Sequence, residues 1–400
     1  MLDQIRGAAA QSLPAAPARD TVAAPAARLA AIDTLRVLLT ALVIAHHAGQ
    51  AYGPTGGRWP VFNAERAAVL GPFFAVNAAF FMGLFFLLAG FFTPGAYDRK
   101  GALGFLRDRL LRLGLPFAVI TLGMFGLLAY LGSDRTLSFP AFLRDVYIGQ
   151  GQYEVGHLWF VLHLLVYAGA YWLWRLATAR RVPVAGWQPG LPGQRAIVGY
   201  MLILAGATAL VRIWYPIDRW ERVLGLIPAE IAHVPQYASL FVIGVIAARG
   251  GWLERMPARV GLGWLLIGAY AGAARYAYSL TGGWPLPGLL AGGGAGWPTM
   301  IWSLWEALIC VGLCIGLPVF LREYASRPGA LLRALAPNAY GAYLIHLVPV
   351  VVLQQALAGS APPPLGYPRG GGGGGSSQLP DRGSHPRHSR PAASRDLTPG

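Results

Sequence analysis

The chain has 400 residues and a formal net charge of +15, yet only 12% of its residues are charged and 55% are hydrophobic. Soluble domains carry about twice that charged fraction, so these numbers exclude a soluble multidomain protein. The basic residues lie in short segments between apolar runs, with no basic stretch interleaved with aromatic residues, which argues against nucleic acid as a partner.

Apolar runs of about 20 residues, the length that crosses a bilayer, recur along the chain. We therefore expect an all-α fold, a polytopic transmembrane helical bundle with about nine spans. The expected spans are 34–52, 70–92, 113–132, 157–175, 196–214, 233–249, 260–279, 300–320 and 335–358. The expected domains are a disordered cytoplasmic N-terminus (1–31), a transmembrane domain (32–358) and a disordered low-complexity tail (359–400).

The distribution of Lys and Arg predicts the orientation of the bundle. If the N-terminus is inside, the segments on that side contain 18 Lys and Arg residues and the loops on the other side contain 8. Basic residues are enriched in cytoplasmic loops of membrane proteins. We therefore expect a multi-pass protein with a cytoplasmic N-terminus.

The first span carries ionisable residues at both ends. Asp33 and Arg36 stand three apart and can form an ion pair, and His46–His47 follow at the other end. Eleven residues separate Arg36 from His47, which returns the helix to within about 20° of the same face. Ionisable residues inside a span are functional candidates, and a neutral imidazole is a competent general base. A helix–helix hydrogen bond is the alternative reading of His47.

The segment "FLRDRLLRLGLP" places Arg109 and Arg112 three residues apart at the expected cytoplasmic start of the third span. Arginines can bind phosphate groups with two parallel hydrogen bonds. A simple positive-inside anchor explains the same pattern. The two readings stay open on the residues alone.

Two further segments contain candidate polar residues. In "EVGHLWFVLHLL", Glu154 and His157 stand three apart at the outer end of the fourth span, and in "PNAYGAYLIHLVP" His346 lies deep in the ninth. Either His can also be an ordinary packed residue. Cys310 and Cys314 lie four apart in one span, where disulfide geometry is poor, so we expect two buried thiols. No residue pattern indicates a metal site.

Four stretches together resemble the membrane acyltransferase family 3, including its glucan-biosynthesis protein C branch. They are "IDTLRVLLTALVIAHHA", "FFMGLFFLLAGFF" followed by "FLRDRLLRLGLPF", "GHLWFVLHLL", and "NAYGAYLIHLV". The resemblance covers about residues 30–355. The D-x-L-R…His pattern of the family matches Asp33, Arg36 and His47. Its R-x-x-R matches Arg109 and Arg112, and its LWFL-like motif includes Trp159. Family members usually continue with at least one more apolar span, where this chain has a Gly- and Pro-rich tail.

The resemblance implies an O-acyltransferase of the bacterial inner membrane. Acyl-CoA would be the cytoplasmic co-substrate, with no tightly bound cofactor, and a hydroxyl of an extracytoplasmic glycan or similar acceptor would receive an acetyl or succinyl group. His47 would act with Arg36 and Asp33 as general base or as acyl carrier. Arg109, Arg112, Glu154, His157, Trp159 and His346 would contact substrates. Membrane lipid surrounds the bundle. The alternative is a transporter, which would move its substrate without changing covalent structure.

Overall fold

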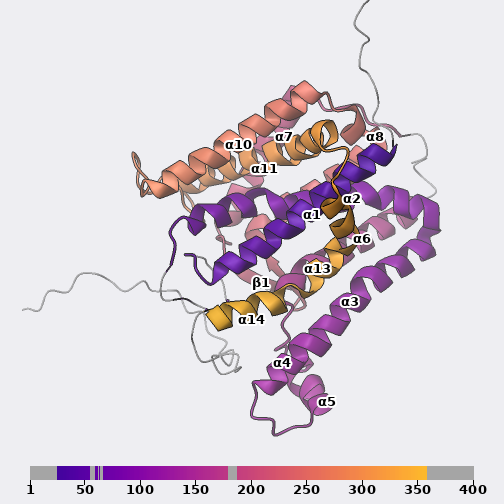
Figure 1. Ribbon diagram of the computed structural model, residues 1–400, viewed down its shortest axis with the longest axis vertical. Helices are drawn as coiled ribbons and strands as arrows, with labels where there is room; N and C mark the ends of the chain where they lie inside the picture. Colours follow the sequence, from indigo (N-terminus) through magenta and orange to yellow (C-terminus); the bar gives the residue numbers. More distant parts are fainter. Residues whose placement is uncertain (1–24, 55–58, 62, 64–65, 179–186, 358–400) are drawn as a thin grey trace, which may run out of the picture.

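The computed structural model describes residues 25–54, 59–61, 63, 66–178 and 187–357. Almost all of the regular structure is helical, as expected (Figure 1). The α-helices are α1 (Pro25–Gln50), α2 (Leu70–Arg109), α3 (Leu115–Ala118), α4 (Gly126–Leu131), α5 (Phe139–Phe142), α6 (Trp159–Thr178), α7 (Gln194–Arg212), α8 (Val234–Gly250), α9 (Trp252–Arg255), α10 (Ala258–Leu280), α11 (Trp297–Tyr324), α12 (Ala330–Leu335), α13 (Ala339–Ile345) and α14 (Leu347–Leu357). Short π- and 3-10 turns join several of them: η1 (Leu110–Gly114), η2 (Val119–Phe125), η3 (Leu143–Ile148), η4 (Gly156–Leu158), η5 (Ile231–His233) and η6 (Ala336–Asn338).

Two strands, β1 (Trp220–Val223) and β2 (Ile227–Glu230), form an antiparallel hairpin between α7 and η5. Leu224 and Gly225 at its turn have positive φ angles of 53° and 71°. Consecutive residues in this left-handed region are typical of tight hairpin turns. The hairpin is tied to the loop before η4, because the Tyr153 hydroxyl donates hydrogen bonds to the carbonyls of Gly225 and Leu226.

Glycines allow the long central helices to approach closely. A Cβ added to Gly90 of α2 would lie 2.0 Å from the Phe241 carbonyl oxygen of α8, and one on Gly244 would lie 2.1 Å from the Leu87 carbonyl oxygen. In a membrane, where lipid is as apolar as the side chains, such backbone contact is a main source of helix association. The α2–α8 pair therefore forms the packed centre of the bundle.

Among the residues that the structure describes, six helices are long and apolar enough to cross a membrane, or seven if the bent pair Ala330–Ile345 and Leu347–Leu357 is one span. All nine expected segments are largely helical where the structure describes them, but two differences lower the count of candidate spans. Residues 70–92 and 113–132 lie in the helical run Leu70–Leu131, which counts once, although a kink at Gly101, with φ 69°, divides this run into two helices. Helix α10 is too weakly apolar by composition, since small residues fill much of it.

The bundle also begins earlier than expected. Helix α1 starts at Pro25, inside the expected disordered segment 1–31. The sequence "PAARLAA" explains the difference, because Pro suits the first turn of a helix and Ala has the highest helix propensity. Residues 1–24 and the tail from 358 lie outside the described residues.

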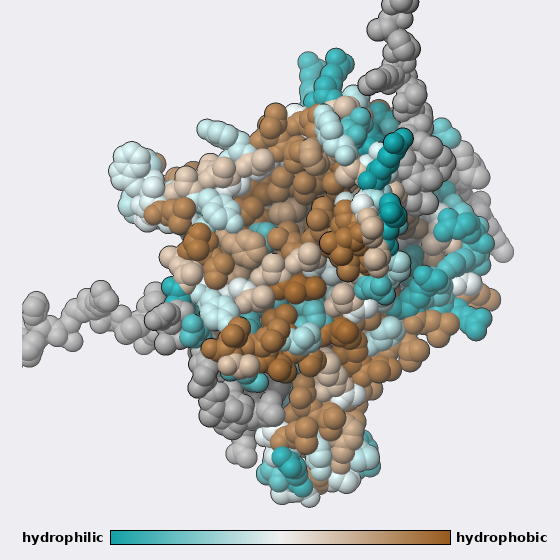
Figure 2. Space-filling view, in the orientation of Figure 1, coloured by the Kyte–Doolittle hydropathy of each residue, from teal (hydrophilic) through white to brown (hydrophobic). Residues whose placement is uncertain are grey.

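The surface agrees with a membrane environment. Large apolar side chains such as Ile203, Leu266 and Leu353 are more than half exposed. Figure 2 shows one face covered mostly by hydrophobic residues, with hydrophilic residues gathered towards its upper and right edges. A surface of this kind is unfavourable in water and stable in lipid. The chain is a multi-pass helical membrane protein.

Candidate active site

The structure brings three histidines from distant parts of the chain into one group: His47 of α1, His157 of η4 and His346, which lies between α13 and α14. We call this group the histidine cluster. The His47 Nδ1 and His346 Nε2 atoms are 2.7 Å apart and share a hydrogen bond. The ring of His157 lies 4.7 Å from that of His346 and 6.4 Å from that of His47, centroid to centroid.

His346 reaches the cluster because the chain bends at this residue. Helices α13 and α14 meet there at 65°. Pro349 follows three residues later, and a proline lacks the N–H that would continue α13 and clashes with the carbonyl four residues before it. His346 is buried, and its Nδ1 donates a hydrogen bond to the Tyr343 carbonyl at 2.7 Å.

His157 enters the cluster from a 3-10 turn. Gly156 adopts a φ of +46°, and a Cβ there would lie 2.8 Å from the Phe125 ring, so glycine permits both the turn and the packing. The buried His157 ring donates from Nε2 to the Leu344 carbonyl at 3.0 Å. Its own carbonyl accepts a hydrogen bond from the Tyr343 hydroxyl. The 3-10 turn is thus fixed to α13 at two points.

Two residues hold His47 from its other side. The Trp59 ring stacks on His47 at 5.4 Å and 12°, and its indole N–H donates to the Gln354 side-chain oxygen at 2.9 Å. The Gln354 amide donates in turn to the His47 and Ala48 carbonyls at 3.0 and 2.9 Å. The end of α1 is therefore clamped between the Trp59 loop and α14. Sequence reasoning missed both residues, although Gln354 in the run "VVVLQQAL" is a visible polar signal.

The cluster is a hydrogen-bonded group and not a ligand set for a metal. A zinc ion needs about 2.0–2.1 Å to each histidine nitrogen, so the 2.7 Å between His47 and His346 leaves no room for an ion between them. Within the described part of the chain, His, Cys, Asp and Glu side chains form no group of three that could hold a metal. The arrangement suits proton transfer.

The other residues of the first span lie apart from the cluster. Arg36 Nη1 donates to Asp33 Oδ1 at 3.3 Å, which confirms the expected ion pair, and both side chains are more than 40% exposed. His46, adjacent to His47, points into a group of aromatic rings formed by Phe73, Phe74 and Phe81. The two neighbouring histidines therefore have different surroundings.

A basic group lies around the end of α2. Arg112 Nε pairs with Asp108 at 2.9 Å, and Lys100 pairs with the same carboxylate at 2.5 Å. The Arg109 guanidinium lies 5.0 Å from the centre of the Phe105 ring, and its buried Nε has no hydrogen-bond partner among the described residues. The Arg112 side chain is 72% exposed, so its guanidinium remains accessible to an anion.

Glu154 and Trp159 have separate surroundings. The backbone N–H and carbonyl of Glu154 both bond to the Tyr147 hydroxyl, at 3.1 and 3.2 Å. Trp159 stacks on Tyr237 at 5.5 Å and meets Trp220 of the hairpin edge-on. Trp159 therefore connects α6 to α8 and to the hairpin, and it makes no ring contact with the histidine cluster.

A second buried polar group was missed by the sequence analysis. The Arg212 guanidinium is fully buried and lies 2.6 Å from Glu306, whose carboxylate also accepts a hydrogen bond from His233 at 2.8 Å. His233 pairs on its other side with Glu230 at 3.0 Å. Burial raises the pKa of the Glu230 carboxyl, but His233 outweighs this and holds the pKa below its ordinary value. A glutamate inside the apolar run "IWSLWEALICVGL" is a signal that could have identified this group.

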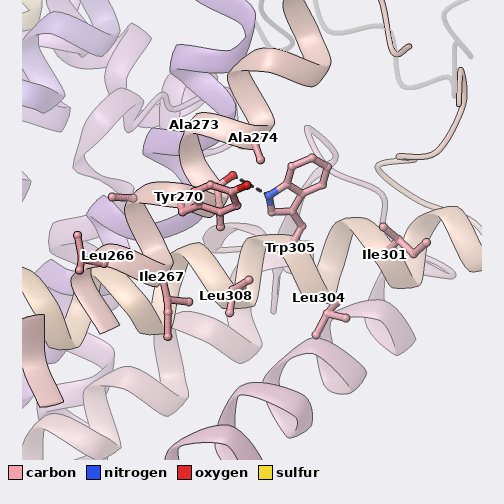
Figure 3. Close-up of a pocket in the computed structure, with 11 residues that line it drawn as sticks. Leu266, Ile267, Tyr270, Ala273, Ala274, Ile301, Leu304, Trp305 and Leu308 are labelled. Carbon is pink, nitrogen blue, oxygen red and sulfur yellow. Dashed lines mark hydrogen bonds between the residues drawn. The ribbon is translucent and has the colours of Figure 1, made fainter. Parts of the chain in front are cut away.

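A surface groove of about 920 Å³ lies elsewhere, between α10 and α11 (Figure 3). Its lining is almost wholly apolar, and the Trp305 indole N–H is already bonded to the Ala271 carbonyl at 2.7 Å. Figure 3 shows Leu266, Ile267 and Leu308 along this lining. It offers no acid, base or nucleophile for chemistry. Cys310 and Cys314, on the same helix α11, are buried free thiols, as expected.

The chain is thus a multi-pass helical membrane protein with a partly buried histidine cluster among its helices. Residues 29–371 match the acyltransferase domain of acyltransferase family 3, and the chain belongs to this family. It is therefore a membrane member of this family. The match covers the histidine cluster, the basic group and the buried ion pairs.

Among curated proteins, the chain is similar to "Glucans biosynthesis protein C" of Shigella dysenteriae serotype 1 (strain Sd197) and of Escherichia coli (strain K12). Each is 30% identical over 147 residues, which is 36% of this chain and 37% of the relative. The matched stretch thus spans little more than a third of these relatives. No solved structure matches the chain.

Proposed function

We propose that this acyltransferase moves an acetyl or succinyl group from cytoplasmic acyl-CoA to a hydroxyl of an extracytoplasmic glycan, with His47 as the group that handles the proton. The histidine cluster is the observation that carries the proposal. It provides a partly buried imidazole, held in place by Trp59, Gln354 and His346, at the end of a span. The name of the similar proteins, which refers to glucans, supports a glycan acceptor.

The reaction balances without a metal or an oxidant. The acceptor hydroxyl oxygen forms a bond with the thioester carbonyl carbon, and the carbon–sulfur bond breaks. His47 takes the hydroxyl proton as general base and returns it to the departing thiolate, so CoA leaves as its thiol. If His47 instead carries the acyl group, its nitrogen first bonds to the acyl carbon as the carbon–sulfur bond breaks, and the acceptor oxygen then bonds to this carbon as the nitrogen–carbon bond breaks. The hydroxyl proton replaces the acyl group on His47, and the thiolate leaves as the thiol after taking a proton from the imidazole. A positioned general base contributes about 10²- to 10⁴-fold to the rate.

The basic group at the end of α2 would receive the phosphates of acyl-CoA. Arg112 presents an exposed guanidinium, and the buried Arg109 Nε has no hydrogen-bond partner among the described residues. Guanidinium groups bind phosphate with strong, paired hydrogen bonds. This assignment puts the basic group on the cytoplasmic side and the N-terminus inside, in the bacterial inner membrane. The count of basic residues on the two sides supports the same orientation.

Isotope-labelled acyl-CoA tests the proposal. Membranes containing wild-type protein, His47→Ala or His46→Ala are incubated with labelled acetyl-CoA or succinyl-CoA and a glycan fraction, and mass spectrometry measures the acyl mass added to the glycan. We expect label with the wild type and His46→Ala, and its loss with His47→Ala. His46 is the matched control because its ring contacts Phe74 and Phe81 outside the cluster. Movement of unmodified glycan across the membrane would instead indicate a transporter and overturn the proposal.

A further inference from the structure

The hydrogen bonds of His346 determine which of its nitrogens carries the proton. His346 Nδ1 lies 2.7 Å from the Tyr343 carbonyl oxygen, and a carbonyl can only accept. Nδ1 of His346 therefore carries a proton. A neutral imidazole has one N–H, so the other nitrogen, Nε2, holds a lone pair and must be the acceptor of its own hydrogen bond.

That assignment extends to His47. His346 Nε2 lies 2.7 Å from His47 Nδ1, so Nδ1 of His47 is the donor. His47 is then the tautomer protonated at Nδ1, and its lone pair is on Nε2. We propose that His346 is a positioning residue that fixes this tautomer of His47, so that Nε2 is the atom that receives the proton of the acceptor hydroxyl. The catalytic part of this inference rests on the proposed function, whereas the tautomer does not.

The surroundings of the pair show how the tautomer is maintained. His346 is anchored by a carbonyl from its own bent turn, at the junction of α13 and α14. Trp59 packs on His47 with an interplanar angle of 12°, and the His346 ring, tilted from His47 by the same angle, meets it through the 2.7 Å hydrogen bond, so rotation of the His47 ring would break both contacts. A side chain held in this way keeps its geometry through the reaction.

The hydrogen-bond partner of His47 is a neutral imidazole, that of His346, where many enzymes place a carboxylate. The titratable side chains whose rings face His47 are His46 at 5.9 Å, His157 at 6.4 Å and His346 at 5.0 Å, centroid to centroid. A carboxylate would add a full negative charge to a partly buried site, which is costly in a membrane. A neutral imidazole supplies an acceptor atom without that charge, and its own proton is fixed by Tyr343.

Three substitutions of His346 separate the two hydrogen bonds. In His346→Gln, the amide oxygen can reach the position of Nε2 and accept from His47. In His346→Asn, the shorter amide reaches only the position of Nδ1, so the bond to Tyr343 is kept and the bond to His47 is lost. His346→Leu loses both at a similar volume. We expect His346→Gln to keep kcat within a few fold, and the other two variants to lose about 10- to 100-fold in kcat with the KM for acyl-CoA unchanged.

The tautomer itself can be observed without any turnover. The ¹⁵N spectrum of protein labelled at its histidine ring nitrogens, in lipid bilayers, distinguishes protonated from unprotonated nitrogen, and the His47 signals are identified by their absence in His47→Gln. We expect protonation at Nδ1 in the wild type and in His346→Gln, and a mixture of tautomers in His346→Leu. Wild-type protonation at Nε2 overturns the inference, as does an unchanged kcat in His346→Asn and His346→Leu. If the wild type shows Nδ1 protonation but transfers no acyl group, the proposed function fails, and the assignment of the His47 tautomer to its hydrogen bond with His346 stands.

Discussion

Removing the carboxylate of Glu306 is expected to destabilise the protein strongly. Arg212 is fully buried, and its guanidinium lies 2.6 Å from Glu306, which also accepts from His233 at 2.8 Å. In Glu306→Ala, the Arg212 guanidinium keeps contacts to the Ser303 hydroxyl and to His233 Nε2, each at 3.3 Å, but loses its carboxylate partner. Breaking a buried ion pair by removing one partner costs about 3–5 kcal/mol, because the remaining charge stays buried without compensation.

Glu323→Ala is the matched control on the same helix. Glu323 pairs with Arg322 at 2.6 Å, but its side chain is 36% exposed, and exposed ion pairs contribute about 0–1 kcal/mol. The free energy of unfolding of both variants would be measured in the same detergent or bilayer system by thermal or denaturant unfolding. A wild-type free energy of unfolding in Glu306→Ala, or equal destabilisation of the two variants, would contradict a structural role of the buried ion pair. Replacing Arg212 and Glu306 together by Leu should restore much of the loss.

Three further outcomes are expected. Gln354→Leu removes the hydrogen bonds to Trp59 and to the His47 carbonyl, so the rate of labelled acyl transfer should fall about 10-fold. The control variant Gln355→Leu should keep a rate near that of the wild type, and equal rates in the two variants would contradict the role of Gln354 in holding the end of α1. Arg112→Ala should raise the KM for acyl-CoA several-fold with little change in kcat, and an unchanged KM in steady-state kinetics would remove Arg112 from donor binding. In Gly90→Leu the new side chain would clash with the Phe241 carbonyl, so size-exclusion chromatography should show no folded protein. In Gly206→Ala the added Cβ meets nothing within 4 Å, so the yield of folded protein should be unchanged or higher.

The sequence predicts the class of fold well because membrane spans are encoded locally. Each expected segment needs only a run of apolar residues, and all nine are largely helical where the structure describes them. The expected spans 70–92 and 113–132 lie in one helical run because the residues between them, including Arg107 and Arg109, are good helix formers, and a kink at Gly101 divides this run. Whether a helix leaves the bilayer or continues past its surface depends on tertiary packing, which a hydropathy pattern does not contain.

The histidine cluster was predictable residue by residue but not as a group. His47, His157 and His346 were each identified because an ionisable residue in a span is costly. Their contact depends on the bend at His346 and the turn at Gly156, which bring segments 299 residues apart to within 2.7 Å. Trp59 gives no local signal, since its loop is rich in Gly and Pro and its partner Gln354 is almost 300 residues away. Pairings at such separation need the three-dimensional structure.

The rate of CoA release by the purified protein tests directly whether His47 takes part in acyl transfer. Protein in lipid nanodiscs is supplied with acyl-CoA and glycan acceptor, and the free thiol of CoA is measured over time for wild type, His47→Ala and His46→Ala. We expect acceptor-dependent thiol release that falls by about 10²- to 10⁴-fold in His47→Ala and stays near the wild-type rate in His46→Ala. Wild-type rates of acceptor-dependent release from His47→Ala would contradict the role of His47 and, with it, the assignment of the histidine cluster as the active site.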